Sequence, residues 1–149
     1  MTDADFHRAI RRIRWLHWLH YLVQALVMGS VVLVVGRRAA VGNTLEPRLA
    51  TWPALLLLAT LVPAVGVLLY GVYRRMQPNL RRPAEENLRI YLCRIFIRNS
   101  LLGLVGLPML ASYLITHKPF DLIAAAGMLL ALSWRLAPSA QKYQRWLLS

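Results

Sequence analysis

The sequence has few acidic residues and almost no cysteine. Its 149 residues include 6 Asp and Glu against 18 Lys and Arg, which gives a formal net charge of +12 at pH 7. The single cysteine, Cys93, excludes an internal disulfide and any metal site built from several cysteines. Charge of either sign is also missing from several long stretches, and these stretches decide the class of protein.

Three stretches contain no Asp, Glu, Lys or Arg, and they cover residues 15–36, 51–73 and 99–117. Each is close to the ~20 apolar residues that a helix needs to cross a bilayer. Hydrophobic residues make up 58% of the chain, above the ~45–50% typical of soluble domains. The basic residues lie between these runs instead of clustering on a soluble surface, as they would in a nucleic-acid-binding protein. The sequence therefore predicts an integral membrane protein that binds no nucleic acid.

The pattern predicts an all-α membrane protein with a single domain over residues 1–149. We expect four transmembrane helices, at about 15–35, 52–73, 98–116 and 120–136. The fourth is short, because the residues between Asp121 and Arg135 cover only ~20 Å of a hydrocarbon layer that is ~30 Å thick. We expect it to cross the membrane fully, and a re-entrant hairpin is the alternative.

The distribution of basic residues predicts the orientation in the membrane. Fourteen of the eighteen Lys and Arg residues lie in the two tails and in the loop between the second and third spans. By the positive-inside rule, this places both termini in the cytoplasm, although Arg37 and Arg38 lie on the other side. The 5 tryptophans fall near the predicted membrane borders, where an indole ring is favoured.

The central loop predicts a helix of its own. Pro83, Glu85 and Glu86 are typical of a helix start, and apolar residues follow at helical spacing. We expect one helix over Ala84–Thr116, whose first part, about residues 84–97, extends from the membrane into the cytoplasm. This region is either a solvated basic extension or a contact surface for anionic lipid head groups or a partner protein. The candidate contact residues are Arg74, Arg75, Arg81, Arg82, Arg89 and Arg94.

Two prolines lie near the middle of predicted spans, Pro63 in the second and Pro108 in the third. Each removes a backbone hydrogen bond and crowds the preceding turn, so we expect each to kink its helix. Paired interruptions at the midplane can mark a transport site, although they more often serve bending and close packing. Gly66, Gly103 and Gly106 would let neighbouring backbones approach closely, within this chain or in a partner.

No residue pattern indicates catalysis, a cofactor or a metal site. We find no Ser/His/Asp or Cys/His arrangement, no phosphate-binding glycine loop and no spaced metal ligands. His17, His20 and Gln24 share one face of the first span. We favour a role in helix packing over a haem or metal site, because the other membrane-border histidine, His117, is expected at the opposite side of the bilayer. No carboxylate is expected inside the hydrocarbon, which argues against proton-coupled export.

The tail beyond the fourth span contains Tyr143, Trp146 and two leucines, and it is a candidate for a short surface helix. The last third of the chain carries a resemblance. The pattern Arg98-Asn99-Ser100-Leu101-Leu102-Gly103 through Tyr113-Leu114-Ile115-Thr116, then a short apolar helix ending at Pro138, resembles a group of small, uncharacterised four-transmembrane-helix proteins of the bacterial inner membrane. An acidic residue often stands in that group where this chain has Gly103. The resemblance implies a four-helix fold and the inner membrane but no activity.

Together these features predict a small integral membrane protein without enzyme activity. We expect an accessory, scaffold or assembly subunit of a membrane complex, which acts through helix contacts and lipid contacts. Its expected partners are anionic membrane lipids and a membrane protein or a second copy of the chain. The alternative is a small oligomeric transporter or channel for a neutral or anionic solute.

Overall fold

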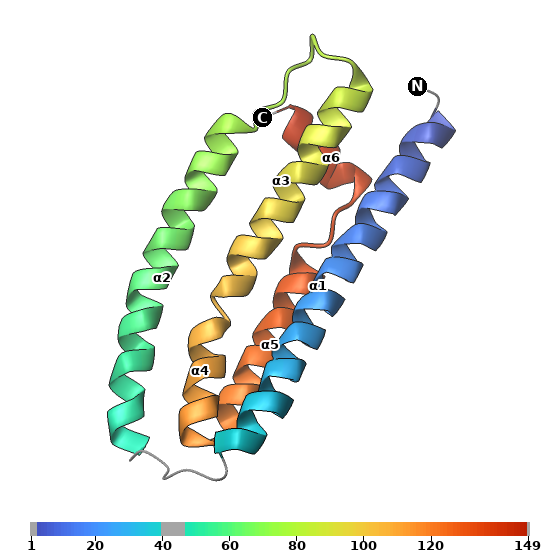
Figure 1. Cartoon of the computed structure of the whole chain (residues 1–149). Helices are drawn as coiled ribbons and strands as arrows, with labels where there is room; N and C mark the ends of the chain where they lie inside the picture. Colours follow the sequence, from blue (N-terminus) through green and yellow to red (C-terminus); the bar gives the residue numbers. More distant parts are fainter. Residues whose placement is uncertain (1–2, 40–46, 149) are drawn as a thin grey trace.

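The computed structural model describes residues 3–39 and 47–148, and these residues form helices joined by short turns, without a β-strand among them. The helices are α1 (Asp3–Ala39), α2 (Pro47–Arg75), α3 (Ala84–Leu104), α4 (Leu107–Thr116), α5 (Pro119–Arg135) and α6 (Ala140–Leu147). Figure 1 shows the first five as a bundle of long rods, with α6 crossing one end of it. The predicted all-α fold is confirmed for the described residues.

Among the residues that the structure describes, three stretches are long and apolar enough to cross a membrane. They are Ala4–Val34 in α1, Leu55–Arg75 in α2 and Ala84–Thr116 across α3 and α4. The 17 residues of α5 extend about 26 Å at the usual rise per residue. Taken together, α5 and α6 are also long and apolar enough to cross a membrane, but the two helices are bent by 71° relative to each other. The lengths and composition of the helices therefore agree with a membrane protein.

The single helix that we expected over Ala84–Thr116 is divided into two. α3 ends at Leu104, and α4 follows after Val105 and Gly106. Pro108 explains the break, because its nitrogen cannot donate to the carbonyl four residues earlier and its ring crowds that carbonyl. The amides of Val105 and Gly106 bond instead to carbonyls three residues back, both at 3.2 Å.

Pro63 lies in a different setting from Pro108. It is exposed, and α2 runs without interruption from Pro47 to Arg75. Pro108, in contrast, is fully buried. Of these two prolines, Pro108 lies beside a break in the helix and Pro63 does not.

The α3–α4 pair occupies the centre of the bundle. α2 packs against it on one side and α1 on the other, while α5 packs against α1 and α4 (Figure 1). The N-terminus, the α2–α3 turn and α6 lie at the same end of the bundle, which we call the N-terminal end. The turn between α4 and α5 lies at the opposite end, which we call the α4–α5 end.

An apolar core fills the N-terminal end, where α6 folds against α1 and α3. Its buried members are Ile10, Ile13, Leu88, Tyr91, Ile95, Tyr143 and Trp146. The Tyr91 ring lies 5.1 Å from the Tyr143 ring and 5.2 Å from the Trp146 ring, measured between centroids. Ser139 caps α6 by accepting a hydrogen bond from the Lys142 amide at 3.2 Å. The tail is thus helical, but its aromatic face is buried by protein.

We expect Trp146→Ala to lower the free energy of unfolding by about 3 kcal/mol or more, because it opens a cavity where α1, α3 and α6 meet. Trp134→Ala is the matched control, since that indole is 79% exposed. Unfolding of the detergent-solubilised protein, followed by circular dichroism, measures both effects. Equal stability of the two variants would show that α6 is not docked as described.

Candidate functional site

Three buried polar residues meet between α1, α3 and α5. His17 is 2% exposed, Asn99 is 0% exposed and Ser133 is 4% exposed. The Asn99 Nδ2 atom lies 2.8 Å from His17 Nδ1. On the other side of the ring, His17 Nε2 lies 2.9 Å from the Ser133 carbonyl oxygen. A single imidazole therefore joins three helices.

The partners of His17 define where its proton lies. A carbonyl oxygen can only accept, so Nε2 carries the hydrogen and donates it to Ser133. Nδ1 is then the acceptor of the Asn99 amide hydrogen. Both ring nitrogens are engaged within the protein, so neither is free to bind haem iron or a metal ion. No group of three or more His, Cys, Asp and Glu within residues 3–39 and 47–148 could hold a metal ion either.

Gln24 extends this polar cluster along α1. Its Nε2 atom donates to the Asn99 carbonyl at 3.3 Å and lies 3.2 Å from His20 Nε2. The same amide lies over the buried Gly103 of α3, where a Cβ would approach the Gln24 Cδ to 2.8 Å. Gly103 therefore permits close contact between α1 and α3, and the face predicted from the spacing of His17, His20 and Gln24 is directed at α3.

Three cationic side chains surround the corner between α5 and α6. Arg98 Nη2 donates to the Leu136 carbonyl at 3.0 Å, and Arg14 Nε donates to the Pro138 carbonyl at 3.2 Å. Lys142 Nζ donates to the Arg135 and Ala137 carbonyls at 2.9 and 2.8 Å. The last carbonyls of a helix have no partner within it and carry a partial negative charge. These cations bond to the Arg135 carbonyl at the end of α5 and to three carbonyls that follow it, and they hold α1, α3 and α6 to the end of α5.

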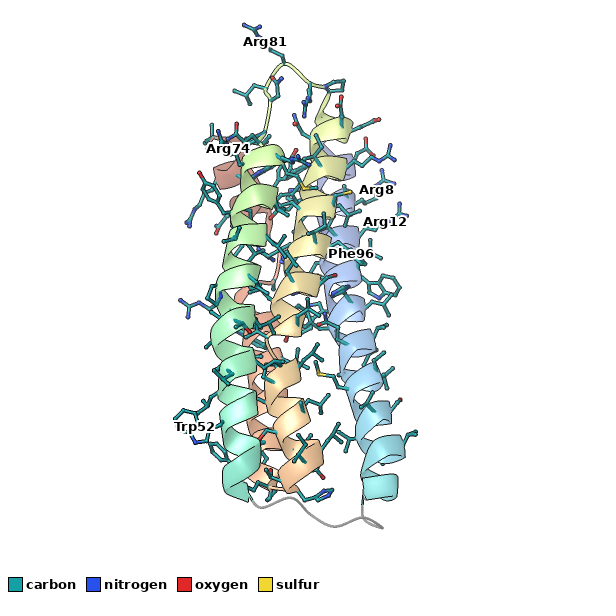
Figure 2. All side chains as sticks on the ribbon, turned by 60° about the vertical axis from the view of Figure 1, so that its left-hand side comes forward. Arg8, Arg12, Trp52, Arg74, Arg81 and Phe96 are labelled. Atoms are coloured by element: carbon teal, nitrogen blue, oxygen red, sulfur yellow. The ribbon has the colours of Figure 1, made fainter. Side chains whose placement is uncertain are left out.

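The candidate contact arginines divide into two groups. Arg74, Arg75, Arg81, Arg82 and Arg89 are exposed at the N-terminal end, where Figure 2 labels Arg74 and Arg81. Arg94 is half-buried, with its guanidinium carbon 4.3 Å from the centre of the Tyr73 ring and 5.8 Å from that of Trp146. A guanidinium over aromatic faces is held by cation–π attraction. Arg94 therefore packs α2, α3 and α6 together.

At the α4–α5 end, Asp121 closes the turn between the two helices. Its Oδ2 atom accepts hydrogen bonds from the Ser112 hydroxyl at 2.6 Å and from the Thr116 hydroxyl at 3.4 Å. Asp121 also lies in the first turn of α5, where the helix dipole favours a carboxylate. This acid thus has a structural role.

Sequence reasoning missed the partners of His17 and the cations at the α5–α6 corner. Asn99 and Ser133 were visible as polar residues within apolar helices, but their pairing depends on how the helices are arranged. Comparison of the chain with family models, with curated proteins and with solved structures found no match. The geometry of the described residues is therefore the basis for a proposed function.

We expect Asn99→Leu to lower the free energy of unfolding by about 1–3 kcal/mol, because it leaves the buried His17 Nδ1 without a donor. Ser100→Ala is the matched control. The Ser100 hydroxyl bonds only to the Phe96 carbonyl of its own helix, at 3.0 Å, so its loss should change stability by less than ~0.5 kcal/mol. Thermal and denaturant unfolding in detergent compares the two variants. Unchanged stability of Asn99→Leu would contradict the role of the Asn99–His17 hydrogen bond.

Proposed function

We propose that the protein is a non-catalytic small integral membrane protein that serves as an accessory, scaffold or assembly subunit of a membrane complex. The use of its interior polar groups supports this proposal. The His17 ring and the Asn99 and Gln24 amides bond to neighbouring helices, so these groups serve to hold the bundle together. The surfaces left for other molecules are apolar helix faces and an arginine-rich end.

Apolar side chains cover the outward faces of α1 and α2. Exposed examples are Leu22, Leu26, Leu33, Leu56, Val67 and Leu68. In a membrane such faces contact lipid or the helices of another protein. Gly66 on α2 and Gly127 on α5 add two points of close approach, because no neighbouring atom lies within 4 Å of a Cβ placed at either. These features favour a protein that works through contact along its helices.

We further propose four spans in a bacterial inner membrane, with both termini in the cytoplasm. The arrangement of charged and aromatic residues supports this orientation. Arg8, Arg12, Arg74 and Arg81 lie toward one end of the bundle and Trp52 toward the other (Figure 2). Because basic residues are retained on the cytoplasmic side, the N-terminal end faces the cytoplasm. α5 is then the fourth span, with α6 on the cytoplasmic side.

The orientation predicts opposite labelling of the two ends. In a Cys93→Ser background, we expect Arg81→Cys to resist a membrane-impermeant maleimide in intact cells and to react after lysis. Lys118→Cys, in the α4–α5 turn, should react in intact cells because that turn faces the periplasm. Both positions are exposed, which makes them a matched pair. Labelling of both positions from the same side would show that the α3–α4 pair does not cross the membrane and would contradict the proposed arrangement.

The proposed function predicts a stoichiometric partner. Affinity purification after extraction in a mild detergent, followed by quantitative mass spectrometry, should recover one membrane protein at a constant ratio to this chain. Gly66→Leu and Gly127→Leu make the same change on α2 and α5 with free space around each. We expect one of them to lower the recovered partner several-fold without changing thermal stability. The absence of any stoichiometric partner, or solute flux through the purified protein in proteoliposomes, would contradict the proposal.

A further inference from the structure

One groove runs between α1 and α3 from the N-terminal end toward the middle of the bundle. It consists of two adjoining hollows, of about 700 Å³ and about 520 Å³, which share Leu16 and Leu92. We call it the α1–α3 groove. Figure 2 shows Arg8, Arg12 and Phe96 one below another on the side where α1 lies next to α3. The groove is therefore lined by charged side chains near the N-terminal end and by apolar side chains nearer the middle of the bundle.

The larger hollow lies nearer the N-terminal end, and we call it the upper hollow. It is positively charged. Arg8, Arg12 and Arg89 line it together with one acid, Asp5. Arg8 is paired with Asp5 at 2.7 Å. Arg12 and Arg89 are exposed and form no ion pair in the described part of the chain. Two guanidinium groups from different helices are thus available to an anion, and guanidinium groups bind phosphate oxygens through paired hydrogen bonds.

The smaller hollow lies nearer the middle of the bundle, and we call it the lower hollow. It is apolar. Leu19, Val23 and Phe96 line it, and Phe96 is 56% exposed despite its size. The eleven residue-to-residue steps from Arg12 to Val23 span about 16 Å of helix. This length is close to half of the ~30 Å hydrocarbon layer, which is the depth of one leaflet. The groove offers positive charge at its outer end and an apolar channel of one leaflet's depth below it.

We propose that the α1–α3 groove binds an anionic phospholipid of the cytoplasmic leaflet. The phosphate lies between Arg12 and Arg89, and one acyl chain follows the lower hollow past Leu16 and Phe96. In this arrangement α3 enters the membrane near Arg89, earlier than the expected start of the third span at residue 98. This order of charge and apolar surface along the membrane normal is that of a lipid, whereas an acidic peptide would need positive charge along its whole length. The inference rests on the membrane orientation proposed above.

Cys93 provides a native reporter for this site, because it is exposed, lines the lower hollow and is the single cysteine of the chain. The protein is placed in nanodiscs of phosphatidylcholine alone or mixed with phosphatidylglycerol. The rate of Cys93 modification by N-ethylmaleimide is measured in each. We expect phosphatidylglycerol to slow the reaction several-fold, since the bound acyl chain covers the thiol. Native mass spectrometry should find the same lipid retained on the protein.

The double variant Arg12→Gln/Arg89→Gln should lose both the protection and the retained lipid. Arg81→Gln/Arg82→Gln removes the same charge from the α2–α3 turn, outside the groove, and should keep both. Protection that survives in the first variant, or that is equal in the two lipid mixtures, would overturn the inference. Protection that rises with protein density without phosphatidylglycerol would assign the groove to a second copy and also overturn it. Partner recovery is measured separately, so loss of the partner with intact Cys93 protection would contradict the proposed function alone.

Discussion

The bundle depends on one constraint: a polar side chain among membrane helices must find its hydrogen-bond partners inside the protein. His17 meets this constraint with the Asn99 amide and the Ser133 carbonyl. Because hydrogen bonds are directional, this contact fixes how α1, α3 and α5 are rotated about their axes, which apolar packing alone specifies less sharply. Gln24 and Gly103 extend the same contact by bringing α1 close to α3. The remaining elements are arranged around this centre.

Positive charge at the N-terminal end has two separate uses. Arg98, Arg14 and Lys142 donate to carbonyls around the α5–α6 corner, and Arg94 packs on aromatic rings. These side chains hold helices together and are not available to other molecules. Within the described part of the chain, Arg12 and Arg89 make neither kind of contact. A count of basic residues predicts an orientation in the membrane, but it does not separate structural arginines from those that can bind.

The sequence predicted those features that depend on neighbouring residues along the chain. Charge-free runs marked the three long apolar stretches, and Pro83 with two glutamates marked the start of α3 at Ala84. We expected Pro108 to kink a single helix, whereas the structure has two helices, α3 and α4, with the break just before Pro108. The partners of His17, the docking of Trp146 and the stacking of Arg94 were not predictable, because each joins residues far apart in the chain. Such contacts depend on which helices lie side by side, which periodicity does not specify.

The shortness of α5 has a consequence for the surrounding bilayer. In the four-span arrangement, its 17 residues fall about 4 Å short of the hydrocarbon thickness. Lipids beside α5 must compress to match it, at a cost of fractions of a kcal/mol per Å. Lipids beside α2 need no such adjustment. The protein would thus make the membrane thinner on one side than on the other, and proteins with short spans would tend to collect on the thin side.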